Sequence, residues 1–248
     1  MDVLGVQPVI NEPALFVQDE EILVIADLHI GIESELIESG VNVESQTNKM
    51  TDRLVLLCKK LNPKKIVLLG DIKHNIPSST IWERKDVKNF LQTIEGFGIV
   101  QILPGNHDGN IKKLISEKTI VHPSDGCIIG NIGFVHGHRW PSEEVMQCEL
   151  IVMAHSHPTV MFTDRRGFRT FEPCWLKAGF IKDKLMERYP ESIDDSQILV
   201  MPAFNPLCGG TAVNKQGIVG PIGKMINIDD SQVYLLDGSF LGRLKDIQ

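Results

Sequence analysis

Seven residues of the types that bind transition metals follow apolar segments of the chain, within a few residues of the end of each segment. The sequence Gly105-Asn106-His107-Asp108 follows the apolar segment 99–103. Four other apolar segments end in the same manner, in Asp27-x-His29, Gly70-Asp71, His136 and His155-x-His157. Each motif alone is typical of an ordinary turn, but independent turns would not place such residues behind five strand-like segments. Because aspartate, asparagine and histidine are ligands for divalent cations, the pattern predicts a metal centre.

The apolar segments have the lengths and composition of buried strands. Segments 22–26, 66–69 and 99–103 are almost continuously apolar, which indicates strands covered on both faces. Between them lie two amphipathic stretches, 45–61 and 80–93, whose apolar residues recur at helical spacing. This alternation of strand and helix predicts a parallel sheet, which brings the polar residues together at its carboxyl edge.

The second half of the chain has a different order of elements. Segments 127–129 and 132–135 flank Gly130-Asn131, which predicts a tight hairpin. Further strands are expected in this half over 150–154, 159–163, 168–175, 197–201, 233–236 and 240–241. Two short strands are also expected near the N-terminus, over 9–10 and 14–17. Short helices are expected over 31–39 and 182–189. No repeat or linker-like stretch divides the chain, so we expect one α/β (α+β) domain over residues 1–248, with two sheets packed between helices.

Composition limits the classes of protein to which the chain can belong. Its 248 residues are 42% apolar and 23% charged, as in an ordinary globular protein. Neither a membrane-spanning stretch nor a signal peptide is seen, so we expect a cytoplasmic protein with no membrane partner. Five widely spaced cysteines are expected to be reduced and mostly in the core, with Cys208 the candidate to lie near the site. The net charge of −7 means that any contact with nucleic acid needs a local basic patch.

Taken in order, the motifs resemble the calcineurin-like metallophosphoesterase superfamily. The resemblance covers residues 22–158 and departs from the family pattern at Ala154, where glycine is usual. It implies a four-layer αββα sandwich, in which two mixed β-sheets pack face to face between helices. It also implies two divalent metal ions, of which Mn²⁺ is expected first, with Fe²⁺, Zn²⁺, Ni²⁺ or Co²⁺ as alternatives. The first ion would be held by Asp27, His29, Asp71 and His157, and the second by Asp71, Asn106, His136 and His155.

Two further histidines take catalytic roles by the same resemblance. His107 would lie over the phosphate, as general acid to the leaving oxygen or as a charge stabiliser. His74 follows Gly70-Asp71 at the spacing found in the double-strand-break repair nuclease and its SbcD relatives, in which Pro-Ser follows, as Pro77-Ser78 does here. A turn residue that faces solvent is the alternative interpretation of His74.

Segments 136–141 and 201–210 resemble a compact archaeal group of SbcD-related phosphoesterases, which are similar to those found beside bacterial DNA ligases and helicases. On this basis the candidates for binding substrate are Arg139, His138, Gly209 and Gly210. Two basic clusters could flank the site, Lys112-Lys113 and the group Arg165, Arg166 and Arg169. Ordinary solvated surface is the alternative interpretation of each cluster.

These observations favour a metal-dependent phosphodiesterase or nuclease that acts on nucleic acid or a nucleotide, with DNA repair as one setting. The partners implied by the resemblance are a phosphodiester substrate, a DNA ligase or helicase, and a second copy of the chain. The alternatives are a small-molecule phosphomonoesterase, a pyrophosphatase or a cyclic-nucleotide phosphodiesterase. An alternative of another class is a non-catalytic metal-binding partner module. The lack of a Val-Asp-Arg-Gly motif disfavours a protein phosphatase.

Overall fold

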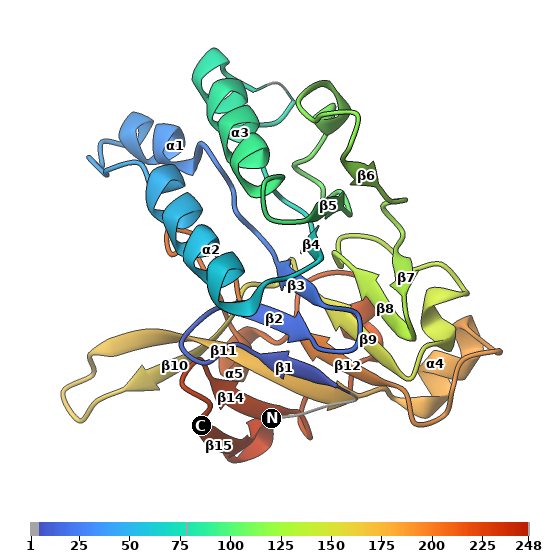
Figure 1. Ribbon diagram of the computed structural model, residues 1–248. Helices are drawn as coiled ribbons and strands as arrows, with labels where there is room; N and C mark the ends of the chain where they lie inside the picture. Colours follow the sequence, from blue (N-terminus) through green and yellow to red (C-terminus); the bar gives the residue numbers. More distant parts are fainter. Residues whose placement is uncertain (1–4, 78, 248) are drawn as a thin grey trace.

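The first of two β-sheets is built around the segments that end in the metal-binding motifs. The computed structural model describes residues 5–77 and 79–247 (Figure 1). Its six-stranded sheet has the order β1-β2-β3-β4-β5-β6. These strands are β1 (Val6–Pro8), β2 (Ala14–Val17), β3 (Ile22–Ile25), β4 (Lys65–Leu68), β5 (Ile99–Ile102) and β6 (Ile120–Val121). The strands from β3 to β6 are parallel, as the alternation of strand and helix predicts, and β1 and β2 add antiparallel pairs at one edge.

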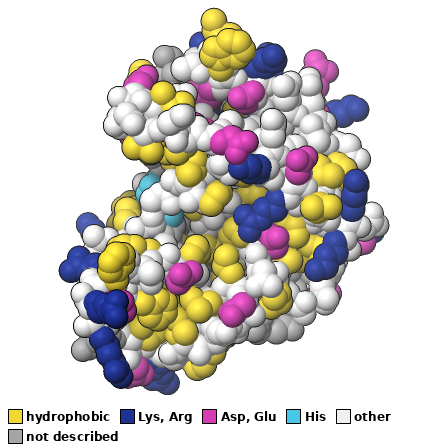
Figure 2. Space-filling view, turned by 90° about the vertical axis from the view of Figure 1, so that its left-hand side faces the viewer, with side chains coloured by type: hydrophobic (Ala, Val, Ile, Leu, Met, Phe, Trp, Pro, Cys, Tyr) yellow, Lys and Arg dark blue, Asp and Glu magenta, His cyan; other side chains and the backbone are white. Residues whose placement is uncertain are grey.

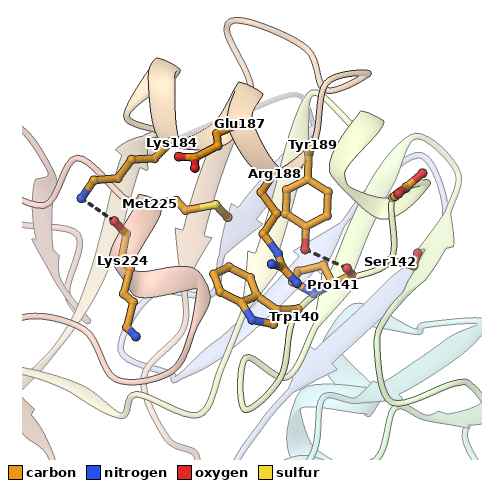
Figure 3. Close-up of a pocket in the computed structure, with 10 residues that line it drawn as sticks. Trp140, Pro141, Ser142, Lys184, Glu187, Arg188, Tyr189, Lys224 and Met225 are labelled. Carbon is orange, nitrogen blue, oxygen red and sulfur yellow. Dashed lines mark hydrogen bonds between the residues drawn. The ribbon is translucent and has the colours of Figure 1, made fainter.

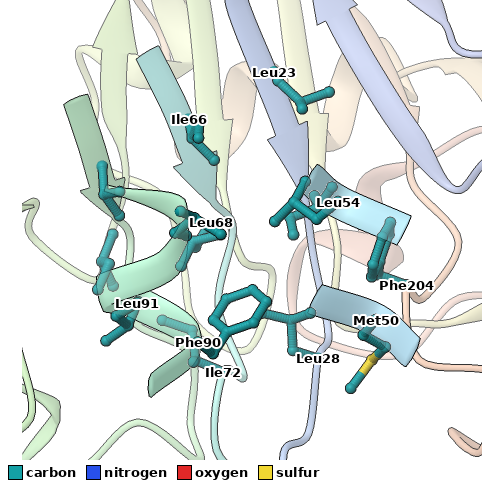
Figure 4. Packing of buried hydrophobic residues seen from close by; sticks show 14 of the residues in the cluster. Leu23, Leu28, Met50, Leu54, Ile66, Leu68, Ile72, Phe90, Leu91 and Phe204 are labelled. Atoms are coloured by element: carbon teal, nitrogen blue, oxygen red, sulfur yellow. The ribbon is translucent and has the colours of Figure 1, made fainter. Parts of the chain in front are cut away.

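Two amphipathic helices cover the outer face of this sheet. The helices of this half are α1 (Ile32–Glu38), α2 (Thr47–Leu61) and α3 (Ile81–Ile94), and all three were expected. Met50 and Leu54 of α2 and Phe90 of α3 belong to one apolar cluster with Leu23 of β3 and Ile66 of β4 (Figure 4). Because successive strand residues point to opposite faces, the neighbours of these two strand residues point into the interior between the sheets.

The second sheet has nine strands and carries the rest of the metal-binding motifs. Its main path runs β13-β10-β11-β12-β9-β8-β7, and β14 and β15 pair beside β11. The strands are β7 (Cys127–Ile129), β8 (Ile132–Val135), β9 (Leu150–Met153), β10 (Pro158–Thr163), β11 (Arg169–Gly179), β12 (Gln197–Val200), β13 (Thr211–Ala212), β14 (Gln232–Leu235) and β15 (Phe240–Arg243). The tight hairpin of β7 and β8 is confirmed.

The two sheets pack face to face through a shared apolar core. Val24 and Val67 of the first sheet meet Phe134, Val152 and Leu199 of the second, and all five are fully buried. The outer face of the second sheet is covered by the C-terminal part of the chain, including α4 (Lys182–Arg188) and α5 (Val213–Gln216). The four-layer arrangement of helices, two mixed sheets and helices is therefore confirmed.

Some boundaries differ from the sequence-based predictions. The first strand is Val6–Pro8, not 9–10, because the amide of Val9 donates to the carbonyl of Ala14 and residues 9–13 form the turn of the hairpin. Strand β11 runs to Gly179, four residues beyond the expected end, since its second half pairs with both β12 and β14. Strands β6 and β13, helix α5 and four 3-10 helices were not predicted.

The 3-10 helices are single turns: η1 (Ile111–Lys113), η2 (Val145–Gln147), η3 (Ile222–Met225) and η4 (Leu244–Asp246). All five cysteines are free, and the four other than Cys208 are buried. None of the helices within residues 5–77 and 79–247 is both long and apolar enough to cross a membrane.

Candidate metal centre

The loops that follow β3 and β4 run side by side and carry the first aspartates. The amide of Asp27 donates to the carbonyl of Gly70, at 3.1 Å, and the amide of His29 donates to the carbonyl of Asp71, at 2.8 Å. The loops behind β8 and β9 reach the same place from the second sheet, because the amide of His155 donates to Oδ2 of Asp27, at 3.2 Å. Residues far apart in the sequence are thereby brought to one point between the sheets.

Five of the predicted ligands have a left-handed backbone, which non-glycine residues seldom adopt. They are Asp27, His29, Asp71, His155 and His157, with φ of 55°, 40°, 50°, 69° and 42°. Such conformations cost about 1 to 3 kcal/mol each and persist where the surrounding structure enforces them, most often at functional sites. The strain turns each side chain out of the strand and towards the common centre.

Two glycines of the motifs make room for neighbouring ligands. A Cβ on Gly70, whose φ is 85°, would lie 2.1 Å from Nδ1 of His136. A Cβ on Gly105 would lie 2.1 Å from Oδ1 of Asp71. Since atoms cannot approach so closely, only glycine fits at either position. The glycines in Gly70-Asp71 and in the 105–108 turn are therefore packing requirements of the centre.

The carboxylate of Asp71 lies between histidines that come from different sheets. Its Oδ2 is 3.2 Å from Nε2 of His136 and 3.6 Å from Nε2 of His29, while its Oδ1 accepts a hydrogen bond of 2.9 Å from the amide of His107. The carboxylate of Asp27 holds a similar position, with Oδ1 3.4 Å from Nε2 of His157. A carboxylate placed in this way can bridge two cations.

The buried nitrogens that face these carboxylates have no hydrogen-bonding partner among the described residues. They are Nε2 of His29, His136 and His157, and Oδ1 of Asp27 is likewise unpartnered. The opposite nitrogens are fixed: Nδ1 of His136 donates to the carbonyl of Leu69 at 2.9 Å, and Nδ1 of His157 donates to that of Gly209 at 3.0 Å. These bonds leave the Nε2 lone pairs pointing at the carboxylates. Buried groups are rarely left unpaired, so the arrangement fits cations placed between them.

The electrostatics of the centre also fit bound cations. Burial alone would raise the pKa of Asp71, but the nearby imidazole of His136 and the hydrogen bond from the backbone of His107 outweigh it and hold the pKa well below its usual range. Burial opposes the charged form of His29 and lowers its pKa to about 4. For His136, burial is outweighed by the nearby carboxylate of Asp71, which raises the pKa to about 9. The centre therefore holds buried anions that need positive charge nearby.

The ligand atoms form two groups that share Asp71. Ligand atoms of Asp27, His29 and Asp71 all lie within 4.8 Å of one another, and so do those of Asp71, His136 and His155. Burial lowers the pKa of His155 to about 4, which leaves its ring neutral and able to bind a metal. Such buried histidine and aspartate clusters are consistent with a binuclear metal site.

The two candidate catalytic histidines lie at the side of the His29 group. Nδ1 of His107 is hydrogen-bonded to the backbone carbonyl of His74, and the two rings stack with centroids 5.5 Å apart. The ring of His74 reaches Nδ1 of His29, at 3.2 Å, and Oε2 of Glu35, at 2.5 Å. With 13% of its side chain exposed, His74 is a neighbour of the centre and not a solvent-facing turn residue.

Asn106, His138 and Arg139 lie outside the two groups of ligand atoms. Asn106 is exposed, and within residues 5–77 and 79–247 its side chain makes no hydrogen bond, although Gly105 before it packs against Asp71. The ring centroid of His138 is 5.3 Å from that of His136, and Nε2 of His138 accepts from the exposed Arg139.

The loop before β13 completes the centre on the side of His157. Gly209 contributes the carbonyl that orients the His157 ring, and Gly210 packs against Thr159. Sγ of Cys208 contacts the carbonyl of Asp27 at 3.6 Å, which places this cysteine near the site as expected. Burial raises the pKa of the Cys208 thiol, so the group stays protonated.

Three supporting carboxylates were not predicted as part of the site. Asp108 is buried and accepts hydrogen bonds from the amides of Gly105 and Ile72, at 2.9 Å each, which closes the turn that carries His107. Glu83 accepts from the amide of His74 at 2.9 Å, besides forming the capping box of α3 with Thr80. Glu35 has no local sequence signal, because its partner His74 lies 39 residues away. The Thr80-x-x-Glu83 pattern was visible, but its second role depends on tertiary contacts.

Comparison with known proteins places this centre in a family. The family model for calcineurin-like phosphoesterases matches residues 21–181, which include every predicted ligand. The chain belongs to this family. A calcineurin-like phosphoesterase hydrolyses phosphate esters, and with its buried histidine and aspartate clusters this one is a metal-dependent phosphoesterase.

The fold is shared with a solved nuclease structure, and two other solved structures are weaker matches. The phosphoesterase is similar to the nuclease MPE of Pseudomonas putida, with 19% identity over 94% of this chain and 97% of that one, and a TM-score of 0.60. It also matches the phosphoesterase Yfce of E. coli, with 16% identity over 90% and 97% of the two chains and a TM-score of 0.39. A third match is Zn²⁺-bound Vps29 of Entamoeba histolytica, with 16% identity over 88% and 94% of the chains and a TM-score of 0.32.

The histidines of the phosphoesterase are reached from outside. Figure 2 shows histidine side chains inside a hollow of the surface. His107 and His155 are both partly exposed, whereas Asp27 and His136 are fully buried. Solvent therefore reaches His107 and His155, while the carboxylate of Asp27 lies deeper.

Proposed function

We propose that the protein is a phosphodiesterase that hydrolyses nucleic acid or nucleotides with two divalent metal ions. The observation that carries the proposal is the pair of ligand groups joined at Asp71, with His107 hydrogen-bonded to the same carboxylate. One ion would be held by Asp27, His29, Asp71 and His157, and the other by Asp71, Asn106, His136 and His155. Asn106 would have to turn inward from its exposed position to complete the second set.

The ligand chemistry supports Mn²⁺ as the preferred ion. Mixed carboxylate, amide and imidazole ligands suit Mn²⁺, Fe²⁺ and Zn²⁺ better than Ca²⁺, which takes oxygen ligands. When bound, the ions supply Lewis acidity that activates water and stabilises the charge on the phosphoryl oxygens.

His107 is placed to move a proton to the leaving oxygen. Its Nδ1 is held by the carbonyl of His74 and its backbone amide by Oδ1 of Asp71, which fixes the loop and the ring together. The remaining nitrogen, Nε2, is then the atom that can carry a proton to the departing alkoxide. His74, held between His29 and Glu35, orients this assembly through the carbonyl that holds the His107 ring.

A basic pocket beside the His107 turn favours a substrate with more than one phosphate. Arg84, Lys88 and Lys113 line a pocket of about 310 Å³, in which none of the described lining residues is acidic. The pocket includes Gly109, which lies two residues after His107 and hence at most about 7 Å away along the chain. In a protein with a net charge of −7, such a local cluster supports binding of a polyanion near the scissile bond.

The remaining parts of the proposal concern the setting of the enzyme. The motifs shared with SbcD-related phosphoesterases support a role in DNA repair inside the cytoplasm. The same resemblance supports association with a DNA ligase or helicase. It also supports a homodimer formed through the helices of the first half of the chain. One domain over residues 1–248 is supported by the ligand set itself, since Asp27 and Asp71 follow strands of one sheet and His136 and His155 follow strands of the other.

Hydrolysis of two chromogenic esters tests the proposed reaction. Metal-stripped protein reloaded with Mn²⁺ is compared on bis-p-nitrophenyl phosphate and p-nitrophenyl phosphate, beside the variant His107→Ala. We expect the diester to be preferred and its hydrolysis to be lost in the variant. A monoester preference would overturn the proposal in favour of a phosphomonoesterase or another small-molecule hydrolase.

A further inference from the structure

A second pocket leads away from the metal centre along the β10–β11 hairpin. This hairpin pocket has a volume of about 640 Å³ and is lined by residues that include Met161, Thr163, Arg169, Phe171, Gly210 and Lys215. It adjoins the centre, because its lining residue Gly210 follows Gly209, whose carbonyl accepts from Nδ1 of His157, and because β10 begins directly after His157. A ligand in the pocket would therefore extend from the side of the site that is formed by His157 and Gly209.

The register of the hairpin builds one wall of the pocket. Met161 pairs with Phe171 and Thr163 pairs with Arg169 in the antiparallel ladder. Paired residues, and residues two apart on one strand, point to the same face of a sheet. The Phe171 ring and the Arg169 guanidinium are thus neighbours on the face that lines the pocket.

Helix α5 forms the opposite wall and fixes the position of a second cation. The side chain of Asn214 accepts from the amide of Met161 and donates to its carbonyl, both at 3.0 Å. This double hydrogen bond ties α5 to the edge of the hairpin. Lys215, the next residue, is thereby held where it lines the pocket.

The charges and the aromatic ring of the hairpin pocket are free to meet a ligand. Among the described residues, no carboxylate forms an ion pair with Arg169 or Lys215, and none of the described lining residues is acidic. Phe171 is 51% exposed, an unusual position for a large apolar side chain beside two unpaired cations. Cations that track a phosphate backbone, interleaved with aromatic rings on which bases stack, are the pattern of single-strand binding.

The tip of the hairpin continues the same pattern. Arg165 and Arg166 are exposed there, and Phe168 is 76% exposed. Oδ1 of Asp164 accepts from the amides of Arg166 and Phe168, at 2.8 and 2.9 Å, so the turn is ordered. The hairpin extends away from the body of the molecule (Figure 1), which gives a strand access to both its base and its tip.

The larger pocket beside Trp140 has a different character. Its volume is about 830 Å³, but the guanidinium of Arg188 already covers the Trp140 ring, with Cζ 3.8 Å from the centroid (Figure 3). Glu143 and Glu187 line it together with lysines, so its charges are mixed. It therefore offers no free face of the Trp140 ring, and acidic side chains lie among its cations.

We propose that the hairpin pocket binds the single-stranded part of a nucleic-acid substrate, with a base stacked on Phe171 and phosphates held by Arg169 and Lys215. The inference rests on the proposed phosphodiesterase function and specifies its substrate. Single strands are favoured over duplexes because a paired base does not expose its face to a side chain. Phe168 and the tip arginines extend the contact to further nucleotides.

Binding of a fluorescent oligothymidylate to His107→Ala protein, in which we expect cleavage to be about 100-fold slower or more, tests this proposal. Phe171→Ala in that background is compared with Phe162→Ala, its matched control, because Phe162 pairs with Thr170 and points to the opposite face of the hairpin. Stacking of one base contributes about 1 to 3 kcal/mol, so we expect Phe171→Ala to weaken binding about 5- to 150-fold. We expect the control to bind as the parent does, and both variants to melt as the parent does.

The cations are tested by the salt dependence of the same binding. Lys215→Gln and Arg169→Gln should each reduce the slope of log K against log salt by about 0.7, the value for one phosphate contact of a single strand. Equal binding by the Phe171 and Phe162 variants, or an equal loss of affinity for a blunt duplex, would overturn the proposal. Since the readout is binding and not turnover, this failure is distinct from a failure to hydrolyse bis-p-nitrophenyl phosphate.

Discussion

Replacement of Gly70 by alanine tests whether the glycine before Asp71 is needed to seat His136. The added Cβ would lie 2.1 Å from Nδ1 and 2.5 Å from Cγ of the His136 ring. The ring is fully buried, so it cannot swing into solvent, and it must lose its 2.9 Å hydrogen bond to Leu69. Alanine must also adopt the left-handed φ of 85°.

These contributions set the size of the effect. The left-handed backbone costs an L-residue about 1 to 2 kcal/mol. Leaving a buried hydrogen-bonding group unpaired adds about 1 to 3 kcal/mol. We therefore expect Gly70→Ala to lower the free energy of unfolding by about 2 to 5 kcal/mol. Disturbing the partner that orients a ligating histidine typically costs about 10- to 100-fold in metal affinity, which we expect in addition.

Gly40→Ala is the matched control for this prediction. Gly40 has almost the same φ, 84°, but a Cβ there would have no neighbour within 4 Å. It should therefore show the backbone cost alone and keep the metal affinity of the parent. Denaturant unfolding of the metal-free proteins and calorimetric titration with Mn²⁺ measure both quantities. Equal metal affinity in the two variants would refute the steric reasoning.

Three further predictions concern the proposed ligands and the catalytic histidine. His107→Ala should keep the fold and the metals but lower kcat for bis-p-nitrophenyl phosphate by about 100-fold or more, the usual contribution of a general acid; unchanged kcat would remove His107 from the mechanism. Asp71→Asn should lose metal and activity together, because it removes the shared negative charge, and full occupancy measured by elemental analysis would contradict that role. The gain in melting temperature on adding Mn²⁺ should increase between pH 7 and 9. Folding raises the pKa of His136 from 6.5 to about 9 in the metal-free protein. Its protonated ring therefore stabilises the metal-free fold fully below pH 6.5, and this stabilisation is lost as the pH rises through 9. Metal binding needs the deprotonated ring, so it is favoured over the same range. A gain that falls with pH would argue against His136 as a ligand.

The sequence was sufficient to predict the parts of the site in which a ligand residue directly follows an apolar strand, because one local pattern then shows both the strand and the ligand. Asp27 and Asp71 follow parallel strands of one sheet, and His136 and His155 follow parallel strands of the other, so the meeting of each pair at a sheet edge follows from parallel pairing. The helix over 80–93 was likewise visible, because the Thr80-x-x-Glu83 capping box is a local signal that the structure confirms.

The parts that could not be predicted depend on contacts between distant segments. Strand β1 was misplaced because its identity depends on pairing with β2 and not on its own composition. The contact of Glu35 with His74 and the clamp of Asn214 on Met161 join residues 39 and 53 positions apart. The hairpin pocket follows from that second contact, so the sequence showed the basic cluster at 165–169 but not the wall that faces it.

The central claim, a binuclear centre joined at Asp71, is tested most directly by counting metals against activity. Metal-stripped protein is titrated with Mn²⁺ while bound metal and hydrolysis of bis-p-nitrophenyl phosphate are measured in the same samples. The two groups of ligands predict that two equivalents bind and that activity rises with the second. Full activity at one equivalent, or saturation at one equivalent, would contradict the shared centre.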